Sequence, residues 1–109
     1  ESKIDALSTI SGSGPAYVFY LIEQLTAAAK HQGFSDADAA LLVNETFLGA
    51  SALLVAEGKS PETMRKQVTS PNETTERAIA RMSKTDLKQM FIEATDAALA
   101  RAKELAAGK

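Results

Sequence analysis

The chain has 109 residues, of which 45% are hydrophobic and 24% are charged, and its formal net charge is −2. This balance is typical of one folded globular domain and favours it over a disordered chain. The sequence contains no cluster of basic residues that would bind nucleic acid, and no uninterrupted apolar run of about 18 residues that would span a membrane. The chain has no cysteine, and its start, "ESKIDALSTI", lacks the order of a signal peptide. We therefore expect a cytoplasmic protein without nucleic-acid or membrane partners.

The first half of the chain predicts two long helices. The glycines and serines of "ISGSGP", residues 10–15, predict a non-helical stretch, with Pro15 at the first position of a helix. That helix runs to His31 or Gln32 and ends at Gly33. Ser35 and Asp38 resemble a capping box, which predicts a second helix over residues 36–57, ended by Gly58.

The second half predicts three further helices. Ser60 and Pro61 begin a short helix that continues to about Val68, and another ends near Met82. Thr85 is expected to cap the last, from Asp86 to about Ala106. Five helices and no convincing strand predict an all-α domain.

The helix over residues 36–57 is apolar around most of its circumference. Its apolar residues are Leu41, Leu42, Val43, Phe47, Leu48, Ala50, Leu53, Leu54 and Val55. A helix of this kind is normally buried on most sides, and the other four predicted helices can surround it only in part. We therefore expect a dimer, an interlocked helical bundle; the alternative is a compact monomer with a tight alanine core.

Most residue patterns that carry chemistry are missing. The single histidine, His31, stands at a helix end, and no His, Asp or Glu cluster has metal-ligand spacing. The "GSG" of residues 12–14 is not a dinucleotide loop because no strand precedes it and Tyr17 replaces the third glycine. We expect this chain to bind no metal and no nucleotide by itself.

Two helix starts remain as candidate sites. In "VTSPNETTERAI", residues 68–79, Ser70 and Glu73 fit an S-x-x-E capping box with Pro71 at the first helical position. The same stretch could instead bind a carboxylate through the N–H groups of residues 73–75 and the hydroxyls of Thr74 and Thr75. In "SGSGPAY", residues 11–17, the glycines permit either close approach to an anion or a flexible lead into a helix.

Together, "ISGSGPAYVFYLIE" and "VTSPNETT" resemble the C-terminal domain of pyrroline-5-carboxylate reductases. The resemblance covers residues 1–109 and implies a helical dimerisation and substrate-binding domain. It also implies reduction of 1-pyrroline-5-carboxylate to L-proline with NADPH or NADH, which an N-terminal Rossmann domain absent from this chain would bind. Interlocked homodimers, and larger rings of dimers, are implied as well. By itself the chain is expected to be inactive.

Site residues follow from the same resemblance. Thr75 falls on the threonine whose hydroxyl meets the substrate ring nitrogen, which implies a catalytic role. Ser70, Glu73, Thr74 and Thr75 fall on the substrate-binding loop. The chain departs from the family where Asn72 and Glu73 replace two glycines, so the alternative is a helical dimerisation module without chemistry.

Overall fold

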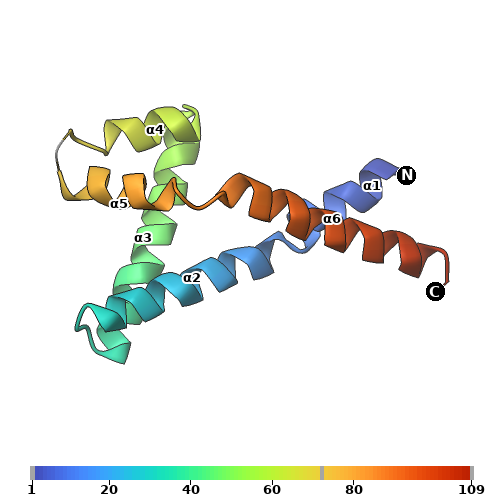
Figure 1. The fold of residues 1–109 in the computed structure, drawn as a ribbon, viewed down its shortest axis with the longest axis horizontal. Coiled ribbons are helices and arrows are strands. Elements are labelled where there is room, and N and C mark those ends of the chain that lie inside the picture. The colour runs from blue at the N-terminus through green and yellow to red at the C-terminus, as the bar shows by residue number, and fades with distance from the viewer. Residues whose placement is uncertain (1, 72, 109) are drawn as a thin grey trace. The chain divides into compact units, whose positions relative to one another are not determined.

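A computed structural model describes residues 2–71 and 73–108, and every regular element within them is helical. The elements are α1 (Ser2–Leu7), η1 (Ser8–Gly12, a π-helix), α2 (Gly14–His31), α3 (Asp36–Glu57), α4 (Pro61–Gln67), α5 (Thr74–Met82) and α6 (Leu87–Ala106). Figure 1 shows them in chain order. The all-α prediction is confirmed, and the five predicted helices correspond to α2–α6.

The chain divides into two compact units, which we describe separately. One comprises residues 1–17 and 78–109, and the other comprises residues 18–77. In the first, the backbone of α6 lies close to α1 and η1.

The prediction of a non-helical stretch at residues 10–15 was wrong, because residues 10–12 belong to η1 and α2 already begins at Gly14. The Ser13 amide donates to the Ser8 carbonyl oxygen at 2.8 Å, a bond that spans five residues. The side chain of Tyr17 donates to the carbonyl oxygen of Thr9 at 2.7 Å, and Thr9 is buried. A wider helical turn closed by a tyrosine therefore replaces the expected flexible segment.

In the second unit, α2 and α3 are joined by a tight reversal. The Gly33 amide donates to the Lys30 carbonyl oxygen at 2.9 Å, and the Phe34 amide donates to that of Ala29 at 3.2 Å. With Gly33 at φ 109°, these bonds form a Schellman motif, as the predicted glycine cap requires. The Ser35 hydroxyl then accepts from the Asp38 amide at 3.1 Å and begins α3.

The remaining helix ends differ little from the prediction. Gly58, at φ 65°, ends α3, and the Ser60 hydroxyl caps α4 by accepting from the Thr63 amide at 3.1 Å. The cap of α6 is Asp86 rather than Thr85, because the Asp86 carboxylate accepts from the Gln89 amide at 3.0 Å.

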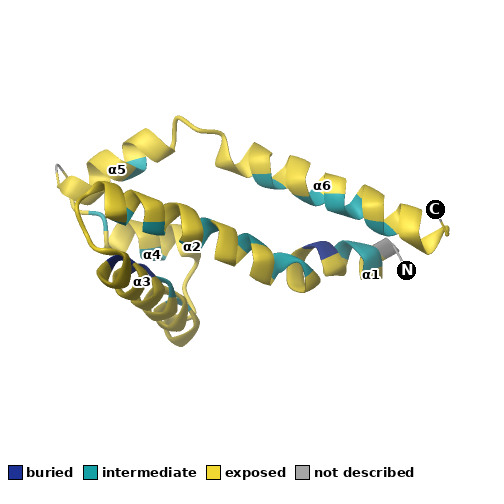
Figure 2. Ribbon diagram, turned by 90° about the horizontal axis from the view of Figure 1, so that it is seen from below, coloured by how far each residue is buried: buried dark blue, intermediate teal, exposed yellow. Residues whose placement is uncertain are grey.

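Little of α3 is buried within the chain. Only Ala39 and Val43 of its residues are buried, while Leu41, Leu48 and Val55 are 61%, 66% and 82% exposed. Figure 2 shows the exposed class along most of this helix. The expectation that neighbouring helices cover α3 only in part is confirmed.

By length and composition alone, α3 could also cross a membrane. It has 22 residues and a window with a mean hydropathy of 1.7, of which 11% is buried. The sequence-based expectation counted uninterrupted apolar residues, and Glu45 breaks such a run, so it did not identify this helix. A core helix covered by a second protein chain passes the same test.

Candidate functional site

The candidate site lies on the turn between α4 and α5. The Glu73 amide donates to the Ser70 carbonyl oxygen at 3.3 Å and closes the turn. The Arg77 amide donates to the Glu73 carbonyl oxygen at 3.3 Å, which makes Glu73 the residue in the N-cap position. Thr74 and Thr75 are then the first two residues of α5.

This geometry contradicts the capping box predicted for Ser70 and Glu73. The helix begins at Thr74, so Pro71 lies in the preceding turn and not at the first helical position. The physical reason is that the Glu73 amide donates to the backbone carbonyl oxygen of Ser70 and so closes a turn. The helix begins only after this turn, at Thr74. Asn72 lies outside the described residues.

The turn brings together two amides at a helix start and two threonine hydroxyls. The amides of Thr74 and Thr75 stand in the first turn of α5, where a helix has no earlier carbonyl groups of its own to accept from them. Both side chains are exposed, as are Ser70 and Glu73. Two N–H groups at the positive end of a helix, with two hydroxyls beside them, form a small surface that favours an anion.

Of the four predicted binding residues, Glu73 fits least well. Its amide already donates to the Ser70 carbonyl oxygen at 3.3 Å, so it is the least suited of the three predicted amides to bind a ligand. Its exposed carboxylate also places a negative charge next to the same helix end. No signal in the sequence alone reveals that the Glu73 amide is engaged in the turn.

The hydroxyls of "SGSGPAY" and of the residues before it are largely used within the chain. Ser8 donates to the Asp5 carbonyl oxygen at 2.7 Å, and Ser11 donates to that of Leu7 at 3.1 Å. Tyr17 bonds to Thr9 as described above. This segment holds a local structure together, which favours the structural interpretation over an anion site.

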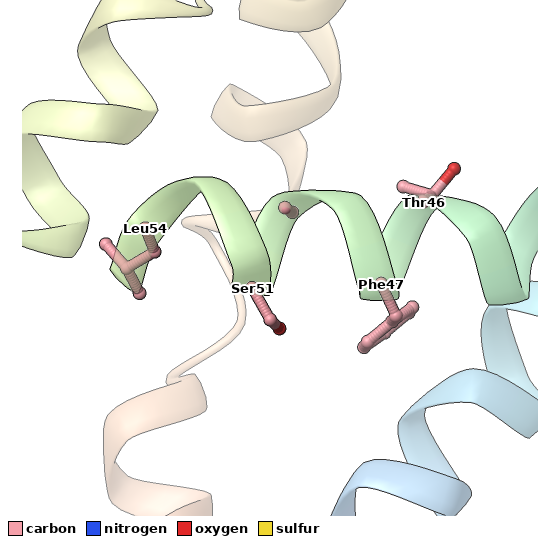
Figure 3. A pocket seen from close by; sticks show the side chains of 5 residues that line it. Thr46, Phe47, Ser51 and Leu54 are labelled. Atoms are coloured by element: carbon pink, nitrogen blue, oxygen red, sulfur yellow. The ribbon is translucent and has the colours of Figure 1, made fainter. Parts of the chain in front are cut away.

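Three open hollows lie along α3, and two of them bear on how the helix is covered. One, of about 330 Å³, is lined by residues of α3 alone, and Figure 3 shows Phe47 and Ser51 projecting on the same side of the helix. The other, of about 660 Å³, lies between α2 and α3. The first hollow is lined by α3 alone, so no other helix of its unit covers this side of α3.

A metal site and a dinucleotide loop would each need a particular geometry in the described part of the chain. No group of three or more His, Cys, Asp or Glu residues there could hold a metal ion. The Gly12–Gly14 segment joins a π-helix to an α-helix, whereas a dinucleotide loop follows a strand.

The regular elements of the described residues are all helical, and they leave most of the long apolar helix α3 exposed, which is typical of a domain that associates with another protein chain. The chain belongs to the pyrroline-5-carboxylate reductase dimerisation family, whose model matches residues 1–105.

Relatives of known sequence support this membership. A pyrroline-5-carboxylate reductase of Pseudomonas aeruginosa is 40% identical over 106 residues, which are 97% of this chain and 39% of that protein. Pyrroline-5-carboxylate reductase 2 of Bacillus subtilis is 35% identical over 96% of this chain and 38% of its own length. The chain thus spans about two fifths of the curated relatives that it matches.

Solved structures show the same fold. The pyrroline-5-carboxylate reductase of Coxiella burnetii matches 96% of this chain with a TM-score of 0.93 and 42% identity, over 39% of its own chain. That of Plasmodium falciparum, with NADP bound, matches 95% with a TM-score of 0.89 and 28% identity, over 40% of its chain.

Proposed function

We propose that this chain is the dimerisation and substrate-binding part of an enzyme that reduces 1-pyrroline-5-carboxylate to L-proline with NADPH or NADH. The observation that carries this proposal is the family match over residues 1–105. The coverage of 39% of a relative's length supports the view that a further domain completes the enzyme.

The nucleotide would be held by that further domain. One structural relative has NADP bound, and the described residues of this chain form no strand that could precede a phosphate loop. When bound, the nucleotide supplies the hydride for reduction of the imine. The residues of this chain bind and orient the other reactant.

Thr75 would position the reacting nitrogen. Its exposed hydroxyl, in the first turn of α5, can donate to or accept from a ring nitrogen while the Thr74 and Thr75 amides hold the substrate carboxylate. Fixing both ends of a small ring orients the imine carbon and gives its nitrogen a hydrogen-bond partner. Ser70 shapes the turn through its carbonyl oxygen.

A second copy of the chain would cover α3. Leu41, Leu48 and Val55 are each more than half exposed, and the family model that matches is a dimerisation domain. Burial of such side chains gives about 1.5–3 kcal/mol each. We assign α3 to a protein interface in a cytoplasmic homodimer, which larger rings would extend, and assign the chain no membrane or nucleic-acid partner.

Turnover tests the proposal. The intact enzyme should oxidise NADPH when 1-pyrroline-5-carboxylate is added, and the 109-residue chain alone should not. A helical dimerisation module without chemistry is the second candidate, favoured by the Glu73 carboxylate at the site. An intact protein that dimerises but shows no turnover with either nucleotide would establish that second candidate.

A further inference from the structure

The side chain of Glu73 places a negative charge at the proposed site. Glu73 stands in the N-cap position of α5, and its backbone amide and carbonyl oxygen each take part in a hydrogen bond at 3.3 Å. Its side chain is exposed, and within the described residues no hydrogen bond or ion pair involves its carboxylate. The Asp86 carboxylate, by contrast, caps its own helix by accepting from the Gln89 amide. The Glu73 carboxylate is therefore available to act on a bound ligand.

The cations of the flanking helices do not pair with this carboxylate. The charged residues of α4 and α5 are Glu62, Arg65, Lys66, Glu76, Arg77 and Arg81. Lys66 pairs with Glu62 at 3.1 Å, and among the described residues no ion pair joins an arginine of these helices to Glu73. A ligand at the first turn of α5 therefore meets the field of at least one carboxylate.

The substrate of the proposed function exists in two charge states. Its carboxylate is negative, and its ring nitrogen is either neutral, as an imine, or protonated, as an iminium. The imine form is an anion, whereas the iminium form is a zwitterion without net charge. A carboxylate beside the site repels the anion. For the zwitterion, repulsion of the carboxylate is offset by attraction of the nitrogen, because both groups belong to the same small ring.

We propose that Glu73 makes this site select the zwitterionic iminium form of the substrate over the anionic imine form. The inference rests on the proposed function and names the form of the substrate that its site takes. In water, a unit charge about 4 Å from another changes an equilibrium by about fivefold, which is the preference expected here. Glu73 is thus a residue that determines specificity, while Thr75 keeps its place at the ring nitrogen.

The iminium form is also the more reactive one. When hydride adds to the carbon of the C=N bond, the electron pair of that bond moves to the nitrogen. The iminium nitrogen already carries a proton and can donate it in a hydrogen bond to the Thr75 hydroxyl, so the product is a neutral amine, which then takes a second proton from water. In the imine form, the same step would leave a negative charge on the nitrogen. Selection of the protonated form therefore reduces the need for a proton donor in the site.

Inhibitors of different charge test the selection. Cyclopentanecarboxylate is an anion with a ring of the same size as that of the substrate, and L-proline is a zwitterion. In the intact enzyme at low salt, Glu73→Gln should lower the inhibition constant of cyclopentanecarboxylate about fivefold and change that of L-proline by less than about twofold. Glu73→Asp, which keeps the charge, should retain the parent preference. Glu104→Gln, which removes a charge from the end of α6, is the matched control and should change neither constant.

The pH dependence of turnover tests the selection on the substrate itself. A nearby carboxylate raises the pKa of the bound ring nitrogen, because it favours the protonated form. On the alkaline side, Glu73→Gln should therefore lower KM and kcat together and leave kcat/KM unchanged, since more of the substrate binds in the less reactive imine form. At a pH where the free substrate is fully protonated, both constants should equal those of the parent. A merely structural role of Glu73 would not produce this dependence on pH.

Equal charge preferences of the parent and Glu73→Gln would overturn the inference. A KM that falls to the same extent at low and high pH would also overturn it, because that result would mean repulsion of the substrate carboxylate alone. In both cases turnover would remain, so the proposed function would stand. An intact protein without turnover would overturn the proposed function and the inference with it.

Discussion

At the scale of single residues, the proposed site depends on the turn between α4 and α5. The Glu73 amide closes the turn, so Thr74 and Thr75 offer the first N–H groups of α5, with their hydroxyls beside them. The ligand surface predicted here from the sequence stays a prediction, and nothing in the sequence indicates that the Glu73 amide is engaged in the turn. The Ser70 carbonyl oxygen accepts from the Glu73 amide, and every residue type has such a carbonyl, so the sequence does not reveal this bond.

Removal of the Thr75 hydroxyl should slow turnover more than it destabilises the fold. In the intact enzyme, Thr75→Ala should lower kcat/KM at least about 100-fold, because the reacting nitrogen loses its positioned partner. Thr75→Ser should retain most activity. Thr85→Ala, in the exposed turn before α6, is the control. Equal kinetic constants for Thr75→Ala and the control would refute the role of Thr75.

Removal of the Glu73 charge should strengthen substrate binding. In the intact enzyme, Glu73→Gln should lower KM by about fivefold or less, since a like charge near a bound carboxylate costs about 1 kcal/mol in water. Glu73→Gly tests bulk as well as charge. Steady-state kinetics at low salt measure both. A KM that rises in Glu73→Gln would mean that the carboxylate contributes to binding.

At the scale of elements, the π-helix was the main departure from the prediction. Two glycines and two serines in "ISGSGP" suggested a loose segment. In the structure, serine and threonine hydroxyls bond back to nearby carbonyl groups, and Tyr17 reaches a carbonyl eight residues earlier. A bond between residues this far apart in the chain is not visible to reasoning from local propensity, whereas the serine and glycine caps of α3 and α4 are local and were predicted.

The Tyr17 hydroxyl should therefore stabilise the junction of η1 and α2. Tyr17→Phe should lower the free energy of unfolding by about 1 kcal/mol, because a part-buried hydrogen bond is lost. Tyr20→Phe, at a residue that is 62% exposed, is the matched control and should change stability by less than about 0.5 kcal/mol. Denaturant unfolding of both variants gives the comparison. Equal losses would show that the Tyr17 bond contributes nothing.

At the scale of the whole molecule, α3 makes association the central feature. The sequence predicted that this helix needs cover on most sides, and the structure leaves 82% of Val55 and 66% of Leu48 exposed. The sequence predicted a second copy as the cover, with a compact monomer as the alternative, although by length and composition α3 also passes the test for a membrane span. The match to a dimerisation domain selects a second protein chain.

Dimerisation should also couple stability to concentration. If folding and association occur together, the midpoint of thermal unfolding should rise as the chain concentration is raised, because mass action favours the folded dimer. Leu48→Asp should lower the midpoint and weaken this dependence, since it places a charge on the exposed apolar surface of α3 that a second copy would cover. A midpoint independent of concentration would indicate that a single copy folds alone.

Sedimentation velocity of the 109-residue chain at micromolar concentration tests the central claim most directly. The account predicts one species with twice the 11.5 kDa mass of a single chain, which dissociates or unfolds on substitution of Leu48 by aspartate. A folded species of 11.5 kDa under the same conditions would contradict it.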